Sequence, residues 1–256
     1  MKIDRYNVLQ HTYYGPRIDN YDLSGLIQCG ERSFSPNPNE AGRNRDYSLD
    51  IMPQEYSTCG VGDFRLPSVE LELPNGSHTA DLRYNGFSIG KGKYTLEGLP
   101  GFYDDEDEAE SLVIFLKDSA AQVAVELYYS VFEAFDLITR AVRVVNQGTE
   151  TVRLCRCASL CLDFLRSDMD MITFNGHHLM ERCLDRGPLR SGIQSVGSVR
   201  GTSSHQHNPF VMLCDRDADE DTGICYGAML LYSGNFEAAV ECSQYENSRL
   251  VMGIHP

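Results

Sequence analysis

The sequence contains no tryptophan and is poor in basic residues. The missing indole removes the largest aromatic ring as a stacking surface for a ligand. Only 22 Lys and Arg stand against 37 Asp and Glu, so the formal net charge is -15 and the isoelectric point is near 4.8. Nucleic acids and anionic membranes are bound by clustered Lys and Arg, because counterion release drives that association. The composition therefore excludes both as expected partners and favours neutral ones.

Long apolar runs and a cysteine framework are missing as well. The first ten residues contain no apolar leader segment, and no stretch approaches the roughly 18 uncharged apolar residues of a membrane span. The nine cysteines are odd in number and lack paired spacing, which is typical of reduced thiols rather than disulfides. These features predict a cytoplasmic protein without a membrane partner.

No segment shows the apolar period of an amphipathic helix, and strands and helices do not alternate. Instead apolar and polar residues alternate over Gln122–Phe132, Leu137–Val145 and Val152–Phe164, which predicts three consecutive antiparallel strands. Shorter strands are predicted at Ser68–Leu73, Thr79–Tyr84, Glu110–Lys117, Ile224–Tyr232, Ala238–Cys242 and Arg249–Met252. The expected fold is all-β, a large antiparallel β-sandwich with little or no helix.

Turns and one long irregular segment separate the strands. Pro74-Asn75-Gly76-Ser77 is the clearest turn, because Asn-Gly accepts the positive φ angles of a tight hairpin. The stretch 20–62 is rich in Pro, Gly and Asn, and a loop of that length is usually functional or disordered. With 256 residues and 42% hydrophobic content, the chain can bury one large core or two small ones.

Seven sequence blocks follow one another along most of the chain. They are ERSFSPNP (31–38), DYSLDIMPQEY (46–56), GDFRLPSVEL (62–71), GKGKYTLEGLPGFY (90–103), RGTSSHQHNPF (200–210), GAMLLYSGNFEAAVE (227–241) and MGIHP (252–256). In this order they resemble the N-terminal domain of bacterial α-galactosidases of glycoside hydrolase family 36. The resemblance implies a single N-terminal β-supersandwich domain over residues 1–256, with a catalytic (β/α)8 barrel and a small C-terminal β domain elsewhere in the whole protein.

The function implied by this resemblance is retaining hydrolysis of terminal α-galactose from oligosaccharides such as melibiose or raffinose. Retention uses a nucleophilic carboxylate and an acid/base carboxyl roughly 5 to 5.5 Å apart. In the family both lie on the barrel, at the loops where barrel enzymes carry their catalytic groups. No barrel motif occurs in this sequence. We therefore expect no catalytic residue, cofactor or metal in this chain, and no hydrolysis by it alone.

The resemblance also implies how the domain serves the whole enzyme. In the family it contacts the barrel, helps to shape the substrate pocket and supports homo-oligomers, often tetramers. The family's sandwich has a further strand before and after the matched region, so we expect both ends to be truncated and their unpaired edges to favour association. Because the fold alone does not determine function, a free-standing carbohydrate-binding or scaffold module is the alternative.

Two residues are candidate sugar contacts by their place in the family pattern. Glu31, where aspartate is usual, precedes the R-x-F-S-P-N-P block, and a carboxylate accepts hydrogen bonds from two hydroxyls at once. His178 stands where the family commonly has a pocket-lining tryptophan. Histidine can bond a hydroxyl but offers a smaller stacking face, so the sugar should be held differently. A solvated glutamate and a loop histidine without ligand are the alternatives.

Two possible metal sites have plainer interpretations. The cysteines at 155, 157 and 161 share one face of a predicted strand and, with Cys183, suggest zinc. Their spacing is not the paired C-x2-C of zinc knuckles and is more typical of core thiols. The acidic run 104–108 suggests calcium but lacks the alternating ligands and turn glycine of a calcium loop, which favours a solvated turn.

His205 and His207 are a third possible pair of ligands. They lie two residues apart, and Asn208-Pro209 follows them, which predicts a rigid loop. Zinc would need at least one more ligand that the sequence does not identify, so a structural loop is the favoured interpretation.

Overall fold

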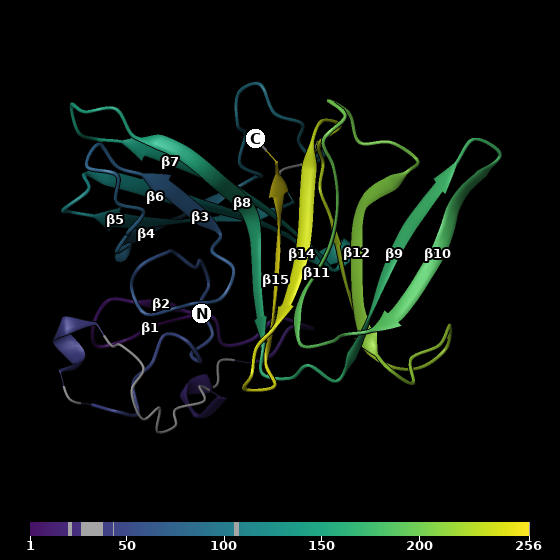
Figure 1. Cartoon of the computed structure of the whole chain (residues 1–256), viewed down its shortest axis with the longest axis horizontal. Coiled ribbons are helices and arrows are strands. Elements are labelled where there is room, and N and C mark those ends of the chain that lie inside the picture. The colour runs from purple at the N-terminus through teal and green to yellow at the C-terminus, as the bar shows by residue number, and fades with distance from the viewer. Residues whose placement is uncertain (20–21, 27–37, 43, 105–107, 256) are drawn as a thin grey trace. The chain divides into compact units, whose positions relative to one another are not determined.

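The computed structural model describes residues 1–19, 22–26, 38–42, 44–104 and 108–255. In these ranges the chain forms β-strands and three short 3-10 helices, without any α-helix (Figure 1). The strand pairings described below are antiparallel. The predicted all-β class, an antiparallel β-sandwich with almost no helix, is confirmed. Among the described residues no helix is both long and apolar enough to cross a membrane.

The chain divides into two compact units, residues 1–160 and residues 161–256. One strand, β8 (Arg153–Phe164), contains the division, with its first eight residues in unit 1 and its last four in unit 2. The single domain over 1–256 that the family resemblance implies stays a prediction. Each unit is described separately below.

Unit 1 contains two sheets and a small hairpin. β4, β5, β6 and β7 form a four-stranded sheet in chain order, β3 pairs with the first part of β8, and β1 pairs with β2. The elements of this unit are β1 (Lys2–Ile3), β2 (Leu9–Gln10), η1 (Leu23–Leu26), η2 (Asn39–Ala41), β3 (Val69–Glu72), β4 (Arg83–Lys91), β5 (Glu110–Asp118), β6 (Val123–Phe132), η3 (Glu133–Phe135) and β7 (Leu137–Asn146).

The alternation along β6 produces the core of unit 1. Val123, Val125, Leu127 and Tyr129 are at most 4% exposed, and they pack with buried side chains of β3 and β5. Val131 continues the same alternation but is 45% exposed, so the buried face ends before it. Each fully buried aliphatic side chain stabilises the fold by about 2 kcal/mol through loss of apolar surface.

The prediction of three consecutive antiparallel strands is wrong for the third. Val152–Phe164 does contain a strand, β8, but β8 pairs with β3, with Val69 opposite Cys157. After β7, Gln147 N donates to the Gln122 carbonyl at 2.8 Å and extends the β6–β7 pairing by one residue, and Asn146 Nδ2 donates to the Glu150 carbonyl within the turn that follows. β8 is instead held by Ala158 N, which donates to the Ser68 carbonyl at 2.8 Å.

The turn and loop predictions in unit 1 fit the structure, but one predicted strand begins later than expected. Gly76 has a φ of 78°, and Leu73 N donates to the Ser77 carbonyl at 2.8 Å, which confirms the turn. The strand predicted at Thr79–Tyr84 begins only at Arg83, because Asp81 N donates to the side chain of Asp118 of β5 rather than to a backbone carbonyl. The described parts of 20–62 contain only two 3-10 helices as regular structure.

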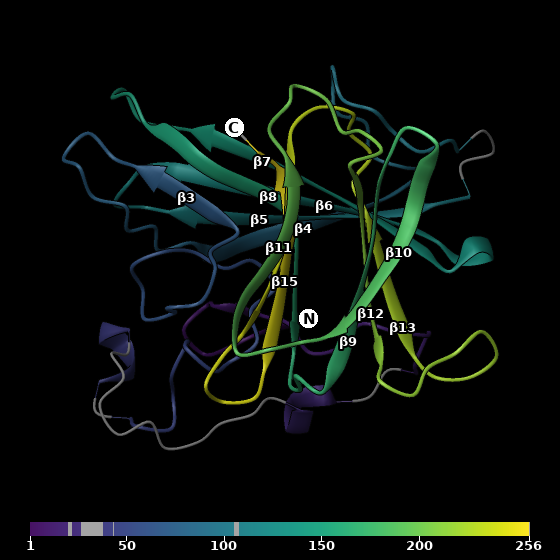
Figure 2. The same ribbon diagram turned by 45° about the vertical axis from the view of Figure 1, so that its right-hand side comes forward.

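Unit 2 also contains two sheets. One has the order β10-β9-β12-β13 (Figure 2), and the other contains β11, β14 and β15 in that order. The elements are β9 (Met169–His177), β10 (Met180–Pro188), β11 (Gly192–Ser198), β12 (His207–Asp215), β13 (Cys225–Met229), β14 (Phe236–Cys242) and β15 (Ser248–Ile254). The predictions at Ile224–Tyr232, Ala238–Cys242 and Arg249–Met252 fall on β13, β14 and β15.

The predicted loop around His205 and His207 is wrong in its second half. β12 begins at His207, which lies opposite Asn175 of β9. Pro209 lacks a backbone N–H, and strands accommodate proline at an edge or a bulge. Here the register of β12 against β9 shifts between His207 and Val211, and this irregularity accepts the proline.

Candidate functional site

The two predicted sugar contacts have different outcomes. Glu31 lies outside the described residues, so its predicted role stays a prediction. His178 is described and lies at the tip of the hairpin formed by β9 and β10 in unit 2. His177 and Met180 are opposite each other, so His178 and Leu179 form a two-residue turn.

The His178 side chain is exposed at this tip, while the backbone beneath it is held in place. His177 Nδ1 lies 2.9 Å from the His178 carbonyl oxygen, and because a carbonyl only accepts, that ring nitrogen carries the proton. Leu179 N donates to Glu181 Oε1 at 3.0 Å. The hairpin therefore presents the imidazole of His178 to its surroundings on a fixed turn.

The base of this turn needs a glycine and contains an irregular register. A Cβ on Gly176 would lie 2.2 Å from the Met180 carbonyl oxygen, so only glycine fits at this close approach. The β9–β10 register shifts between Met180 and Cys183, and Arg182 within this shift has a φ of 59°. Leu179 has a φ of 72°. Two non-glycine residues in left-handed conformations within four positions are a local strain of order 1–3 kcal/mol each.

A hollow of about 620 Å³ lies beside the hairpin in unit 2. It is lined by Glu181, Arg182, Ser203, Ser204, His205, Asn208 and Pro209. The two sides are joined by Gly176 N, which donates to the Gln206 carbonyl at 3.3 Å. The bulge of β10 thus faces the segment that precedes β12.

Most residues that line this hollow have polar side chains, and their charges nearly balance. It offers a guanidinium, a carboxylate, two hydroxyls, an imidazole and an amide. Asn208 Oδ1 is buried and has no hydrogen-bond partner among the described residues. A buried acceptor without a partner is costly, and a donor from a ligand or water would remove that cost. The chemistry matches a neutral ligand with many hydroxyl groups better than an ion.

Sequence reasoning missed most of this lining. The block 200–210 drew attention to His205 and His207, yet Ser203 and Ser204 lie in the hollow and His207 begins a strand. Arg182 could not be identified from the sequence, because the residue types around an arginine do not predict a positive φ. The signal that was available was the block itself, whose composition of small and polar residues is unusual next to a strand.

In unit 1 the sequence blocks 46–56 and 62–71 contribute to buried polar clusters rather than to an open site. Glu55 is 2% exposed, and its carboxylate lies 2.8 Å from His11 Nδ1, 2.9 Å from the Tyr129 hydroxyl and 2.9 Å from Arg140 Nη2. Burial raises the pKa of Glu55, but Arg140, His11 and Tyr129 together outweigh it and hold the pKa below its usual range. The group is therefore a fixed carboxylate, which is a structural rather than a proton-transferring role.

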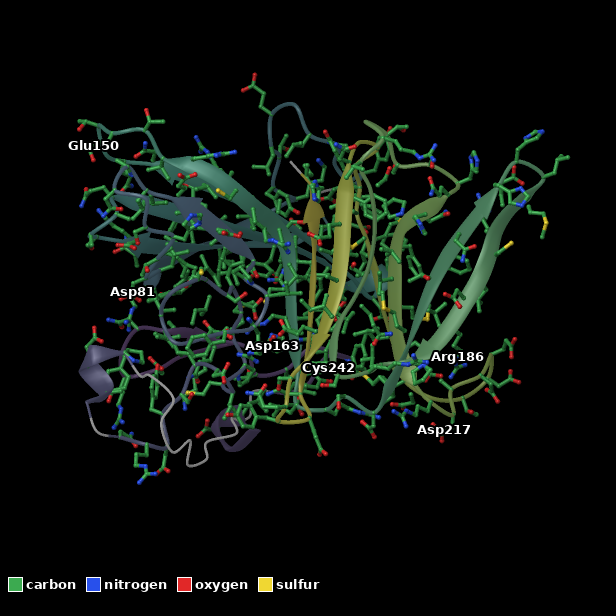
Figure 3. The ribbon with its side chains drawn as sticks, viewed as in Figure 1. Asp81, Glu150, Asp163, Arg186, Asp217 and Cys242 are labelled. Atoms are coloured by element: carbon green, nitrogen blue, oxygen red, sulfur yellow. The ribbon has the colours of Figure 1, made fainter. Side chains whose placement is uncertain are left out.

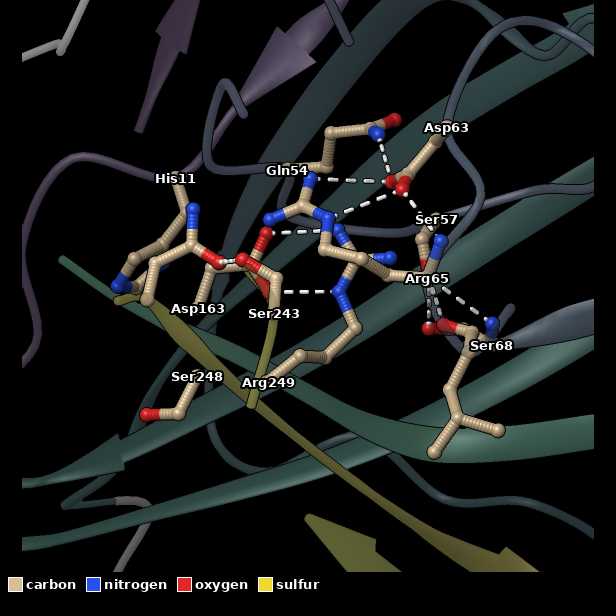
Figure 4. A network of polar contacts seen from close by, with 12 residues as sticks. His11, Gln54, Ser57, Asp63, Arg65, Ser68, Asp163, Ser243, Ser248 and Arg249 are labelled. Atoms are coloured by element: carbon tan, nitrogen blue, oxygen red, sulfur yellow. Dashed lines mark hydrogen bonds and ion pairs between the residues drawn. The ribbon is translucent and has the colours of Figure 1, made fainter. Parts of the chain in front are cut away.

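A second cluster in unit 1 is centred on Arg65, which is 5% exposed (Figure 4). Its guanidinium donates to Asp63 Oδ1 at 2.9 Å and to the carbonyls of Leu49 and Met52 at 2.9 Å each. Gln54 also donates to Asp63. Because the segment has no regular structure, these side chains satisfy its backbone in place of a ladder or helix.

In unit 2, Arg249 is fully buried and forms a bidentate ion pair with Asp163 (Figure 4). Its Nε donates to Asp163 Oδ1 at 2.6 Å, and its Nη2 donates to Oδ2 at 2.7 Å. Among the described residues no group of three or more His, Cys, Asp or Glu is arranged to hold a metal ion. The polar hollow beside the β9–β10 hairpin is thus the best candidate for ligand contact.

Comparison with known proteins gives a consistent result. A family model described as the glycosyl hydrolase family 36 N-terminal domain matches residues 7–256. The bifunctional alpha-galactosidase/sucrose kinase AgaSK of Mediterraneibacter gnavus is 43% identical over 255 residues, covering 100% of this chain and 27% of that protein. Alpha-galactosidase AgaA of Geobacillus stearothermophilus is 41% identical over 257 residues, covering 100% of this chain and 35% of AgaA.

Solved structures agree with the sequence comparison. The galactosidase domain of AgaSK superposes with a TM-score of 0.96 at 43% identity, over 100% of this chain and 35% of that one. A variant of AgaA from Geobacillus stearothermophilus in complex with raffinose gives a TM-score of 0.95 at 41% identity, over 100% of this chain and 36% of that one. The chain thus spans about a third of the length of these relatives.

Proposed function

This chain belongs to the glycosyl hydrolase family 36 N-terminal domain family, and on that premise we propose that it is the non-catalytic N-terminal domain of an α-galactosidase. The whole protein would release terminal α-galactose with retention from oligosaccharides such as melibiose or raffinose. The observation that carries the proposal is the match over 7–256 together with relatives that are α-galactosidases of about three times this length. The catalytic barrel would belong to the remaining two thirds.

The role of the domain in this proposal is to shape the substrate pocket. Support comes from the β9–β10 hairpin, whose tip presents an exposed His178 on a strained turn beside a polar hollow. Backbone strain of this kind costs stability and is concentrated at functional sites. Glu31 is proposed as the second sugar contact on the resemblance alone.

The proposal extends to the cellular setting and the assembly. A cytoplasmic location is supported by the excess of acidic residues and by the described cysteines, which form no disulfide bond. Homo-oligomers of the whole enzyme, tetramers included, and a contact with the barrel rest on the family resemblance. Sedimentation of the whole enzyme would measure the assembly state, and a monomer would contradict this part.

The decisive experiment compares this chain with the whole enzyme. We expect residues 1–256 alone to release no galactose from raffinose or a chromogenic α-galactoside, because no motif of the barrel that would carry the two catalytic carboxyl groups occurs in this sequence. The whole enzyme should be active in the same assay. Turnover by the isolated chain would contradict the proposal, and so would an inactive whole enzyme that is correctly folded by circular dichroism.

A substitution of His178 tests its proposed sugar contact. In the whole enzyme, His178→Trp should lower KM for raffinose several-fold, because the larger ring adds about 1 kcal/mol of stacking on the sugar. His178→Ala should raise KM, with a smaller effect on kcat. The matched control is His78→Trp, which changes another exposed histidine that hydrogen-bonds Glu70. An unchanged substrate profile in both His178 variants would exclude the contact.

One observation favours a second function, a carbohydrate-binding module that works without a barrel. The hollow beside the β9–β10 hairpin has hydroxyl and amide groups suited to a sugar within this chain alone. Calorimetric titration of the isolated chain with galactose and raffinose distinguishes the two functions. Saturable binding that is lost in Ser203→Ala would support the module, whereas its absence supports a domain that contacts sugar only in the whole enzyme.

A further inference from the structure

Two cysteines in unit 2 lie directly opposite each other on neighbouring strands. Cys214 of β12 is the register partner of Cys225 of β13. The adjacent pair is hydrogen-bonded, since Asp215 N donates to the Ile224 carbonyl at 2.9 Å. Antiparallel pairs alternate between hydrogen-bonded and non-hydrogen-bonded, so Cys214 and Cys225 form a non-hydrogen-bonded pair.

This position is the one where two antiparallel strands come closest. The Cα atoms of a non-hydrogen-bonded pair are about 4.5 Å apart and their side chains point to the same face of the sheet. Disulfides span Cα separations of roughly 4.4 to 6.8 Å. Besides burial, the neighbouring Cys225 side chain raises the pKa of the Cys214 thiol, which fits this close register. A bond between them therefore needs little backbone movement.

The two thiols differ in solvent exposure, so each would have a different role in a reaction with an external reagent. Cys225 is exposed on β13, the edge strand of its sheet, and a soluble reagent can reach it. Cys214 is 1% exposed, among Ile172 and Ala218. An external reagent would react with Cys225 first, and Cys214 would then be the nearest thiol to the modified sulfur.

A fixed positive charge from β10 acts on both thiols. Arg186 donates to the carbonyls of Asp215 at 3.1 Å and Ala218 at 2.7 Å, which places its guanidinium at the β12–β13 connection (Figure 3). Burial raises the pKa of Cys214, and Arg186 acts in the opposite direction, while Asp170 and Cys225 raise it further. Asp170 is itself paired with Arg186 at 2.7 Å, which reduces its repulsion of a thiolate. The pKa of Cys214 is raised overall by burial, and Arg186 limits that rise.

We propose that Cys214 and Cys225 form a reversible cross-strand disulfide by exchange with a small-molecule disulfide such as oxidised glutathione. The Cys225 thiolate attacks one sulfur of the oxidant, which forms a mixed disulfide and releases one glutathione thiolate. The Cys214 thiolate then attacks the Cys225 sulfur and expels the second. The two cysteines lose two electrons and two protons, and the oxidant becomes two molecules of glutathione.

The Cys214–Cys225 disulfide would link the edge strand β13 covalently to β12. β13 pairs with only one strand, β12, in its sheet order, so its attachment depends on a single ladder. A covalent link at the first residue of β13 also closes the 215–224 connection into a short loop. The oxidised chain should therefore exchange the backbone amides of 225–229 more slowly with solvent than the reduced chain does.

The test treats the full chain with oxidised glutathione and maps its peptides by mass spectrometry. We expect a peptide in which Cys214 and Cys225 are joined, lighter by two hydrogens than the reduced peptide and restored by dithiothreitol. Cys214→Ser should instead accumulate a glutathione adduct on Cys225, and Cys225→Ser should give neither product. Cys183→Ser is the matched control, because it removes another partly exposed thiol of unit 2 and should leave the joined peptide unchanged.

Two results would overturn the proposal. One is a stable glutathione adduct on Cys225 of the unaltered chain, and the other is complete alkylation of Cys214 and Cys225 by iodoacetamide when the oxidised chain is unfolded in guanidinium. The alkylation readout needs no substitution, so it decides the question even where Cys214→Ser does not fold.

Discussion

Replacing Arg249 by methionine is expected to lower the free energy of unfolding by about 3 to 5 kcal/mol. Arg249 and Asp163 are 0% and 6% exposed, so the substitution leaves a carboxylate buried without its guanidinium. Asp163 would have to bind a proton or admit water, and either costs folding energy. Urea unfolding followed by circular dichroism measures the loss.

The double variant Arg249→Met with Asp163→Leu identifies the cause of that loss. When both charges are replaced by apolar groups of similar size, the net cost should fall to near zero, because the pair's desolvation penalty disappears together with its attraction. Arg153→Met is the matched surface control: its pair with Glu72 is 77% and 40% exposed, so the change should be at most about 1 kcal/mol. A double variant as unstable as Arg249→Met would show that shape, not charge, determines stability there.

Replacing Glu55 by glutamine is expected to cost about 3 kcal/mol at neutral pH, because Arg140 would lose a buried anionic partner. The effect should depend on pH. The folded pKa of Glu55 lies below the ordinary value of 4.5, so its contribution is complete above about pH 4.5 and is lost as the pH falls through the folded pKa. Unfolding measured between about pH 7 and pH 3 should therefore bring Glu55→Gln and the unaltered chain together at acid pH.

An exposed glutamate provides the control for this titration. Glu133 pairs with Arg17 at 2.6 Å, and the two side chains are 78% and 83% exposed, so Glu133→Gln should change stability little at any pH. A difference between Glu55→Gln and the unaltered chain that persists undiminished at acid pH would mean that Glu55 acts by shape and not by charge.

The strands that could be predicted are those with one face in a core. β6 is the clearest case, since every second side chain from Val123 to Tyr129 is buried. β10 and β11 could not be predicted: β10 is exposed at most of its positions, and β11 contains two glycines and two serines in seven residues. The partner of β8 was also beyond the sequence, because alternation reports a buried face and not which strand lies alongside.

Only the part of the candidate site that lies in a recognised sequence motif could be predicted. The sequence directed attention to His178, and the structure places this residue on a turn whose geometry depends on Gly176 and on the positive φ of Leu179. Neither dependence can be read from residue types, because close backbone approach arises from tertiary packing. The hollow likewise joins residues 181–182 to 203–209, which are distant in sequence.

The pairing of β3 with β8 has a consequence for how fast unit 1 folds. Val69 and Cys157 are register partners, so this ladder forms only after the whole intervening chain has closed into a loop. The β4–β7 sheet joins neighbours in sequence and pays a much smaller entropy of closure. The β4–β7 sheet should therefore form early, and the β3–β8 ladder should be the slow step. Until that ladder forms, the unpaired edges of β3 and β8 are the parts of unit 1 most able to pair with other chains and aggregate.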